Sequence, residues 1–388
     1  MAAPRDGNSE RRDAKVCAVT GGRGFLARHL VAALLRSGEW RVRVTDLAPV
    51  VSLESGEDEE LLGAALRDGR AVYMPADVRD LAQLTRGTNF LARLLWAPNE
   101  VCTNTSEVAF QDVDVVFHMA VADHAKNNIQ LHREINVTGT NNVIDACIAC
   151  KVKRLIYTSS IAVVFDGLQG LFDVDESKPY PDKFPDAYGQ TKAEAEKLVL
   201  KANGTSGLLT CCIRPGSIFG PGNNYFISNL GSFGGMKIII GDGENYDDFV
   251  YVENVVHGHI SAERTLSTKE GGERIGGKAY FISNMQPMSM WDFVYMFSEE
   301  LGYKSRFKIR IPSYLLMPVT YVVDWCYNNQ FFLLGIPPLV LTSAKIKYIT
   351  LNRTVNCNRA VEDLDYTPVV SLKEGVKITA EYYNNLRA

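Results

Sequence analysis

Tyr188 and Lys192 lie four residues apart and are the side chains most suited to chemistry in this sequence. On a helix this spacing places the phenol and the ammonium group on one face. A nearby ammonium group favours the phenolate, so we expect the pKa of Tyr188 to fall from about 10 toward working pH, which suits a general acid/base for a hydroxyl group. Because a chain with 17 tyrosines holds about one such pair by chance, the surrounding elements must support the assignment.

A glycine-rich turn near the N-terminus is typical of a nucleotide-binding loop. Gly21 and Gly24 lie directly between a predicted strand and a predicted helix, and the small Ala27 follows with the same spacing. Gly21 allows a tight turn, Gly24 lets a pyrophosphate approach the backbone, and Ala27 allows close helix packing. The helix N-terminus, with the N–H groups of Phe25 and Leu26, offers hydrogen bonds and a positive dipole to the phosphates.

Acidic residues near the ends of the next two predicted strands indicate which nucleotide binds. Asp46 ends the second strand, where a carboxylate accepts hydrogen bonds from ribose hydroxyls and repels a 2′-phosphate. We therefore expect NAD rather than NADP, a preference that Arg23 in the glycine turn weakens by attracting phosphate. Asp77 and Val78, at the end of the third strand, are expected beside the adenine, with Asp77 accepting a hydrogen bond from its amino group.

Two serines follow the fifth predicted strand, at the edge of the sheet where ligands bind in such folds. We expect Ser160 to hydrogen-bond the substrate oxygen and to hold it against Tyr188, while Lys192 also contacts the nicotinamide ribose. Ser159 is the alternative for this role, because the sequence does not show which hydroxyl points inward.

The elements that must position these residues alternate along the chain. Short apolar runs predict strands at residues 16–20, 42–45, 72–75, 113–118, 154–158 and 209–214, and helical periodicity is clearest at residues 27–35, 136–150 and 187–201. This alternation predicts an α/β fold, a doubly wound parallel sheet of the Rossmann type. Ala120 and Pro215, which follow the fourth and sixth strands, are further expected cofactor contacts.

The chain divides into a nucleotide-binding part and a substrate-binding part. We expect a disordered polar tail at residues 1–14, an NAD-binding core at 15–220, and a smaller, mainly substrate-binding region at 221–388 with some segments returning to the core. Residues 87–108 form an unusually long connection and are interpreted as an inserted loop. Polar residues and prolines interrupt the apolar stretch from Tyr314 to Leu341, which favours a buried or interfacial segment over a membrane span.

Composition excludes several classes of protein. With 41 Lys and Arg against 45 Asp and Glu, the net charge of -4 gives no electrostatic reason to expect a nucleic-acid partner. Eight cysteines in 388 residues are too few for a disulfide framework and indicate a reduced, intracellular protein. Residues 1–15 lack the apolar core of a secretory signal. Cys147 and Cys150 form a lone C-x-x-C, which we interpret as helix packing, and no metal site is expected.

Several motifs, in the right order, resemble the extended short-chain dehydrogenases/reductases: TGGRGFLA, ADVRD, VFHMA, INVTGTNNVIDAC, YTSS, YGQTK and RPGSIFGPG. Within this group the sequence is most similar to the 3β-hydroxysteroid dehydrogenase family, and DESKPYP, SGLLTCCIRP and DFVYVENVVHGH resemble its plant-type sterol 4α-carboxylate 3-dehydrogenases (decarboxylating). The resemblance implies oxidation of the 3β-hydroxyl of a 4α-carboxysterol with NAD. Tyr188 would take the hydroxyl proton, and the C4 carboxylate would leave as carbon dioxide.

The resemblance also implies a location and partners. It places the protein at the cytosolic face of the endoplasmic reticulum membrane, with a sterol substrate, peripheral membrane contact, association with other enzymes of sterol C4 demethylation, and a homodimer. Candidates to bind the substrate carboxylate are Lys126 and His124. An apolar trough for the sterol could draw on Phe165, Tyr225, Phe226 and the stretch from Tyr314 onward, ordinary core being the alternative for each.

Two other functions fit parts of the pattern. Another 3β-hydroxysteroid dehydrogenase, or a nucleotide-sugar epimerase or reductase, would use the same scaffold, but a sugar nucleotide calls for polar and basic contacts where this C-terminal region is apolar. A non-catalytic NAD-binding protein is the alternative from a different class.

Overall fold

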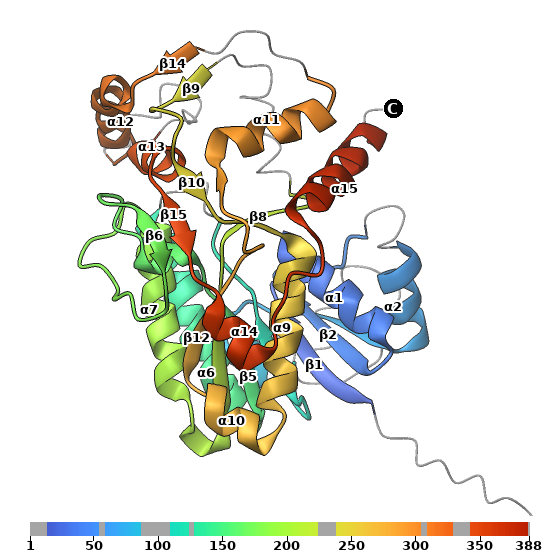
Figure 1. Cartoon of the computed structure of the whole chain (residues 1–388). Coiled ribbons are helices and arrows are strands. Elements are labelled where there is room, and N and C mark those ends of the chain that lie inside the picture. The colour runs from blue at the N-terminus through green and yellow to red at the C-terminus, as the bar shows by residue number, and fades with distance from the viewer. Residues whose placement is uncertain are drawn as a thin grey trace, which may run out of the picture.

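The computed structural model describes residues 14–53, 59–86, 109–123, 128–223, 238–303, 309–328 and 342–386 (Figure 1). Several predictions lie outside these ranges and are not tested by the structure: the inserted loop at residues 87–108, the carboxylate candidates His124 and Lys126, and the trough candidates Tyr225 and Phe226.

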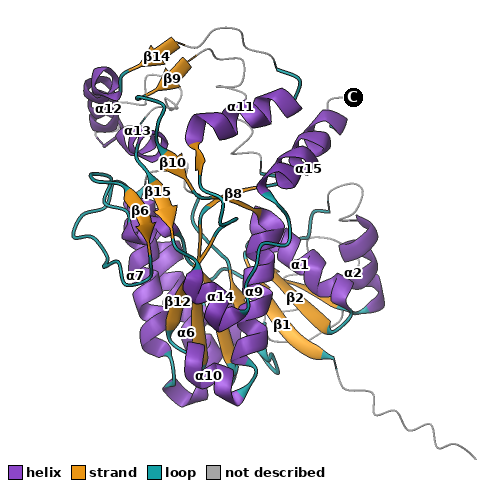
Figure 2. Ribbon diagram, in the orientation of Figure 1, coloured by secondary structure: helices purple, strands orange, loops and turns teal. Residues whose placement is uncertain are grey.

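Among the described residues, seven strands form one parallel sheet (Figure 2). Their order across the sheet is β12 (Lys278–Ile282), β7 (Leu209–Pro215), β5 (Arg154–Thr158), β4 (Val115–His118), β1 (Lys15–Thr20), β2 (Trp40–Asp46) and β3 (Ala71–Pro75). The predicted doubly wound α/β fold is confirmed. Each of the six strands predicted from apolar runs corresponds to one strand of this sheet. The seventh strand, β12, was not predicted and comes from the C-terminal half of the chain. The direction of strand addition reverses between β1 and β4, which is where such folds bind ligands.

The strands are buried on both faces of the sheet, which explains their continuous apolar runs. One face is covered by α1 (Phe25–Ser37), α2 (Ala64–Asp68) and α9 (Val252–Leu266), the other by α3 (Leu81–Arg86), α6 (Gly139–Ala149) and α7 (Ala187–Ala202). In β1, Cys17 and Val19 pack toward α1, whereas Ala18 packs toward α6. Shorter helices are α5 (Ile129–His132), which continues through Arg133–Thr138 into α6, and α10 (Lys269–Ile275).

Smaller sheets and helices lie above the main sheet in Figure 1. Within the described part, β13 (Met288–Ser289), β10 (Tyr246–Asp247), β15 (Arg353–Val355) and β6 (Leu171–Val174) form one sheet, while β8 (Ser217–Phe219) pairs with β11 (Phe249–Tyr251) and β9 (Ile238–Ile240) with β14 (Ile309–Ile311). The helices there are α11 (Met290–Glu300), α12 (Ser313–Asn328), α13 (Ser343–Thr350) and α15 (Leu372–Asn385). Helix α14 (Asn358–Leu364) instead packs beside α9 and β12 of the main sheet. Because β6 precedes α7 in the chain but pairs with β15, the small sheet joins early and late segments.

The two cysteines of the C-x-x-C pattern pack against the main sheet. Cys147 is fully buried in the cluster between α6 and the strands, and Cys150 is partly buried against the same cluster. Burial raises the pKa of the Cys147 thiol well above its ordinary value.

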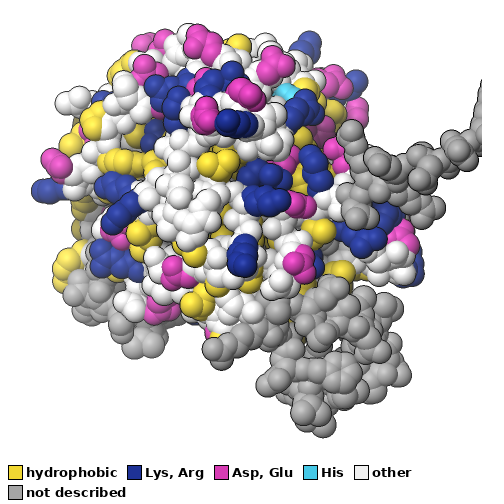
Figure 3. Space-filling view, turned by 90° about the horizontal axis from the view of Figure 1, so that it is seen from below, with side chains coloured by type: hydrophobic (Ala, Val, Ile, Leu, Met, Phe, Trp, Pro, Cys, Tyr) yellow, Lys and Arg dark blue, Asp and Glu magenta, His cyan; other side chains and the backbone are white. Residues whose placement is uncertain are grey.

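Seen from below, the surface carries Lys, Arg, Asp and Glu interspersed with scattered apolar side chains (Figure 3). In the part of the chain that the structure describes, no helix has both the length and the apolar character needed to cross a membrane.

Candidate active site

The glycine turn between β1 and α1 requires glycine at its first position. Gly21 has a φ of +62°, and a Cβ there would lie 2.7 Å from the Cα of Ala120. Both the left-handed backbone and the contact therefore exclude a side chain. This contact also places Ala120, just after β4, directly against the turn, as its assignment to the cofactor site requires.

The turn presents the start of α1 as a cradle for an anion. Gly24 is the N-cap residue and has no side chain to cap the helix, and its own N–H donates to the carbonyl of Gly21 at 2.9 Å. The N–H groups of Phe25 and Leu26 begin the first turn of α1, where backbone donors lack intrahelical acceptors. A bound phosphate would supply those acceptors at the positive end of the helix.

Asp46 is held by the glycine turn itself. Its Oδ2 accepts a hydrogen bond from the Arg23 N–H at 2.8 Å, and its Oδ1 accepts one from the Leu47 N–H at 2.7 Å. The carboxylate is therefore oriented at the end of β2, next to the phosphate cradle. A ribose in line with the cradle would meet these oxygens.

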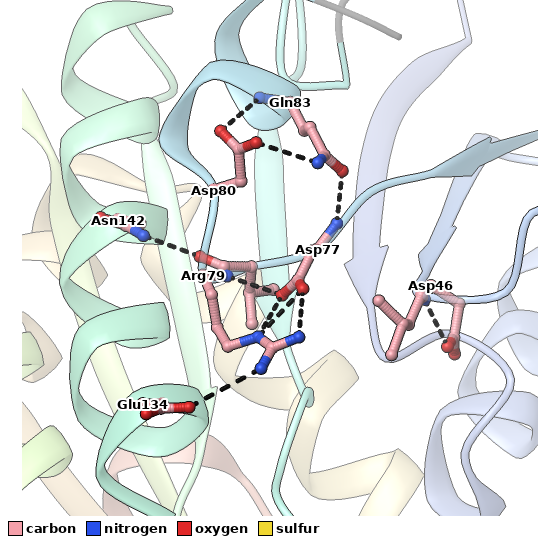
Figure 4. A network of polar contacts seen from close by, with 9 residues as sticks. Asp46, Asp77, Arg79, Asp80, Gln83, Glu134 and Asn142 are labelled. Atoms are coloured by element: carbon pink, nitrogen blue, oxygen red, sulfur yellow. Dashed lines mark hydrogen bonds and ion pairs between the residues drawn. The ribbon is translucent and has the colours of Figure 1, made fainter. Parts of the chain in front are cut away.

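Asp77 follows the neighbouring strand β3 and has a partner of its own (Figure 4). Its carboxylate accepts hydrogen bonds from Arg79 Nε at 2.9 and 3.0 Å and from Arg79 Nη2 at 2.6 Å. These bonds lower the pKa of Asp77. The Val78 side chain is buried against the start of α6, close to Gly139. Contacts of Asp77 and Val78 with adenine stay predictions.

Helix α7 and the segment that follows β5 bring the predicted catalytic side chains together. Asp186 caps α7 by accepting a hydrogen bond from the Gly189 N–H at 2.8 Å, which fixes the helical turn that carries Tyr188. The hydroxyl of Ser160, just beyond β5, shares a side-chain hydrogen bond with Tyr188. Ser159 is turned into the core, with 2% of its surface exposed. Of the two serine alternatives, the structure thus places Ser160 beside Tyr188.

The ammonium group of Lys192 is directed to β5. Its Nζ donates to the carbonyl of Thr158 and lies 4.1 Å from the centre of the Tyr157 ring. Burial lowers the pKa of Lys192 to about 7. The predicted lowering of the Tyr188 pKa is wrong for this structure: burial raises that pKa, and only the Ser160 hydrogen bond lowers it. The spacing puts both residues on one face, and the structure shows the lysine ammonium group bonded to the end of β5.

A buried ion pair, Glu196 with Arg214, lies near Lys192 and was not among the predicted site residues. Glu196, one turn further along α7, accepts from Arg214 Nε at 3.0 and 3.1 Å, from Arg214 Nη2 at 2.6 Å, and from the Tyr180 hydroxyl at 2.6 Å. Its negative charge raises the pKa of Lys192 against the effect of burial. The second i, i+4 step in the sequence, Lys192 to Glu196, is the signal that could have found it.

Buried polar side chains also connect the glycine turn to α7. His118 Nδ1 lies 2.7 Å from Thr20 Oγ1, and its Nε2 lies 2.9 Å from Thr140 Oγ1. Burial lowers the pKa of His118 to about 3, so the ring is neutral. The Thr140 hydroxyl donates in turn to the carbonyl of Asn136. The Asn136 side-chain amide then donates to the hydroxyl of Thr191 on α7 at 3.0 Å.

The remaining predicted cofactor and substrate positions differ in where the structure places them. Pro215 ends β7 at the carboxyl edge and pairs with Ile282 of β12, on the same edge as the glycine turn. Phe165 is fully buried, with its ring 5.1 Å from that of Tyr348, so it is a core residue as its alternative interpretation held. Tyr314, at the start of α12, is 71% exposed.

Comparison with known proteins identifies the family. A model described as the 3-beta hydroxysteroid dehydrogenase/isomerase family matches residues 18–95 and 101–313. The chain belongs to this family. The gap between the two matched segments falls within the stretch interpreted as an inserted loop.

Relatives from a plant and an animal align over nearly the whole chain. The Arabidopsis thaliana 3beta-hydroxysteroid-dehydrogenase/decarboxylase isoform 1 is 48% identical, covering 96% of this chain and 80% of its own length. Isoform 2 is 44% identical, but this chain spans only 62% of its length. The Mus musculus sterol-4-alpha-carboxylate 3-dehydrogenase, decarboxylating, is 32% identical, covering 96% of this chain and 92% of its own length.

Solved structures confirm the fold of this family member. The UDP-glucuronic acid 4-epimerase from Bacillus cereus in complex with NAD matches 96% of this chain and all of its own, with a TM-score of 0.66 and 20% identity. At that identity the likeness shows the fold alone.

Proposed function

We propose that this protein oxidises the 3β-hydroxyl of a 4α-carboxysterol with NAD and releases the C4 carboxylate as carbon dioxide. The observation that carries the proposal is the meeting of Ser160, Tyr188 and Lys192 at the carboxyl edge of the sheet that also bears the glycine turn. Membership of the 3-beta hydroxysteroid dehydrogenase/isomerase family and the names of the plant and mouse relatives support the substrate class.

NAD fits the residues present. The tight turn at Gly21, the start of α1, and the oriented Asp46 carboxylate are the features that would hold its pyrophosphate and adenosine ribose. NAD when bound would accept the hydride from C3. The Asp46 carboxylate would repel the 2′-phosphate of NADP, which makes NAD the preferred form. Ala120 and Pro215 lie on the same edge and complete the assigned contacts.

The side chains of the chain itself manage the hydroxyl proton. Ser160 and Tyr188 would both hydrogen-bond the substrate oxygen, and the Tyr188 oxygen would take its proton as C3 is oxidised. Because burial raises the pKa of Tyr188, this transfer favours alkaline pH. Lys192, when protonated, would stabilise the resulting charge distribution and contact the nicotinamide ribose.

Loss of carbon dioxide then needs no further catalytic group. A ketone at C3 makes the C4 carboxylate a β-keto acid, whose carbonyl accepts the electrons of the breaking C–C bond. The resulting enol takes up a proton at C4 from solvent, which gives the 3-keto sterol without the C4 carboxyl group. We assign residues 15–220 to NAD binding and residues 221–388 mainly to the sterol.

The sterol substrate supports a location at the cytosolic face of the endoplasmic reticulum membrane, with peripheral membrane contact. The same reasoning supports association with other sterol C4-demethylation enzymes, and we further propose a homodimer. Fractionation of cells expressing a tagged full-length chain tests the location, and sedimentation velocity of the purified protein tests the dimer.

A substrate panel tests the proposed function. Purified protein with NAD should form NADH from a 4α-carboxysterol, and should neither epimerise UDP-glucose nor form NADH from it. Epimerisation of a sugar nucleotide without sterol oxidation would overturn the proposal. Nucleotide binding without turnover of any hydroxysteroid would instead favour a non-catalytic NAD-binding protein.

A further inference from the structure

Two aspartate–arginine pairs with the same spacing flank strand β3. Asp77 and Arg79 follow its carboxyl end, whereas Asp68 and Arg70 precede its amino end. In both pairs the arginine contacts the carboxylate through its Nε, its Nη2 and its backbone N–H. The two pairs therefore share their chemistry, but only Asp77 and Arg79 lie at the edge of the sheet that carries the glycine turn.

Asp77 lies close to Asp46 at that edge. Strands β2 and β3 pair Asp46 with Pro75, and the Ala76 N–H donates to the Asp46 carbonyl at 2.9 Å. Figure 4 shows the two aspartates at the ends of these neighbouring strands. Because Asp46 is assigned to the adenosine ribose, a base attached to that ribose would lie near Asp77. The Asp77 side chain is 19% exposed, so a ligand can reach it.

Arg79 holds the Asp77 carboxylate in one orientation. Its backbone N–H donates to Oδ1 at 2.9 Å, its Nε to Oδ1 at 3.0 Å and to Oδ2 at 2.9 Å, and its Nη2 to Oδ2 at 2.6 Å. A carboxylate offers about four acceptor positions, so these three donors leave room for another. The same bonds lower the pKa of Asp77, which keeps the carboxylate ionised and able only to accept.

The guanidinium group of Arg79 has a second carboxylate partner. Its Nη1 lies 3.7 Å from Oε2 of Glu134, in the segment Arg133–Thr138 that precedes α6. The other oxygen of Glu134 accepts a hydrogen bond from Gln130 Nε2 at 2.7 Å. Arg79 therefore bridges the end of β3 and the segment before α6, as Figure 4 shows. A side chain fixed on both sides loses little further freedom when a ligand binds.

We propose that Arg79 is a positioning residue that makes the cofactor site selective for adenine, by holding the Asp77 carboxylate where it accepts a hydrogen bond from the amino group of the base. A base with a carbonyl oxygen at the same position would present a second acceptor to the carboxylate, and the two acceptors would repel each other. This inference rests on the NAD binding of the proposed function. It goes beyond that function by naming the residue on which the choice of base depends.

The affinities of two dinucleotides test this role. Deamino-NAD differs from NAD only in a carbonyl oxygen that replaces the adenine amino group. In isothermal titration calorimetry, the wild type should bind NAD about tenfold more tightly than deamino-NAD. Arg79→Met should reduce this ratio to about threefold or less, because a carboxylate free to rotate must be ordered when the base binds. Arg79→Lys keeps the charge without the planar fork and should give an intermediate ratio.

Arg70→Met is the matched control. It removes the arginine of the same kind of pair at the opposite end of β3, and should leave the ratio of the two affinities unchanged. The side chains of Arg79 and Arg70 are 39% and 44% exposed, so both variants should fold, which circular dichroism checks. In an Asp77→Ala background, Arg79→Met should change the ratio no further, because Arg79 acts through that carboxylate.

Two outcomes would overturn the inference. A wild type that binds both dinucleotides equally would show that Asp77 does not receive the amino group. An unchanged ratio in Arg79→Met, whether both affinities stay the same or fall together, would show that Arg79 does not position the carboxylate for the base.

Sterol oxidation assays separate this inference from the proposed function. If the ratio changes as expected but no sterol is oxidised, the role of Arg79 stands and the proposed function fails. If the sterol is oxidised but the ratio is unchanged in Arg79→Met, the function stands and the role of Arg79 is wrong. A chain that binds neither dinucleotide would contradict both.

Discussion

The hydroxyl of Ser160 hydrogen-bonds the phenol of Tyr188, whereas the neighbouring Ser159 is buried in the core. This bond lowers the pKa of Tyr188 against the effect of burial, so its loss should raise that pKa further. We expect Ser160→Ala to reduce kcat on the order of 100-fold at neutral pH and to shift the rise of activity to higher pH. Ser159→Ala is the control. A pH profile of sterol oxidation measures both effects, and equal profiles for the two variants would contradict the assignment.

Gly21 in the glycine turn and Gly38 at the end of α1 form a matched pair for substitution. Gly21 and Gly38 both have positive φ, but a Cβ at Gly21 would strike Ala120 whereas one at Gly38 meets nothing within 4 Å. Gly38→Ala should cost only backbone strain, about 1–2 kcal/mol. Gly21→Ala should in addition weaken NAD binding at least tenfold, which isothermal titration calorimetry would measure. The prediction fails if both variants bind NAD like the wild type.

Burial of Lys192 makes stability depend on pH. Its pKa falls from 10.5 to about 7 in the folded chain, so between these values the unfolded chain binds the extra proton and the free energy of unfolding rises with pH. Without nucleotide, the wild type should gain about 1–2 kcal/mol more than Lys192→Met between pH 6.5 and 8.5. Urea unfolding measures this, with Lys201→Met, exposed on the same helix, as control. Identical pH dependence in wild type and Lys192→Met would show that the lysine is not desolvated.

Replacing only one residue of the buried pair Glu196 and Arg214 should lower the free energy of unfolding more than replacing both. Their side chains are fully and almost fully buried, so Glu196→Ala leaves an uncompensated cation and should cost about 3–5 kcal/mol of unfolding free energy. Adding Arg214→Met should recover part of that loss. Tyr180→Phe removes one hydrogen bond and should cost about 1 kcal/mol. A double variant less stable than Glu196→Ala would refute the argument.

Six of the seven strands of the main sheet could be predicted because they are buried on both faces, whereas β12 was not predicted. Cys17, Ala18 and Val19 pack alternately on opposite faces, yet all three are apolar, so the strand is visible in the sequence alone. The short strands could not be predicted. Leu171 pairs with Arg353, far along the chain, and these strands of two to four residues lack the continuous apolar run of the equally short β4.

The sequence was enough to predict which residues form the candidate site, but not all the contacts that their side chains make. The motifs placed Ser160, Tyr188 and Lys192 together because carboxyl ends of parallel strands share one edge. They did not show that the lysine bonds the carbonyl of Thr158, because helical spacing fixes a face and not the side-chain path.

Tyr188→Phe tests the central claim most directly. The variant keeps the ring and removes the oxygen that would take the hydroxyl proton, so NAD affinity should stay within about twofold of wild type. With a 4α-carboxysterol labelled in its carboxyl carbon, we expect the wild type to release one labelled carbon dioxide for each NADH formed. Tyr188→Phe should lose both products together, on the order of 100-fold or more. Release of carbon dioxide and NADH by Tyr188→Phe at the wild-type rate would contradict the account.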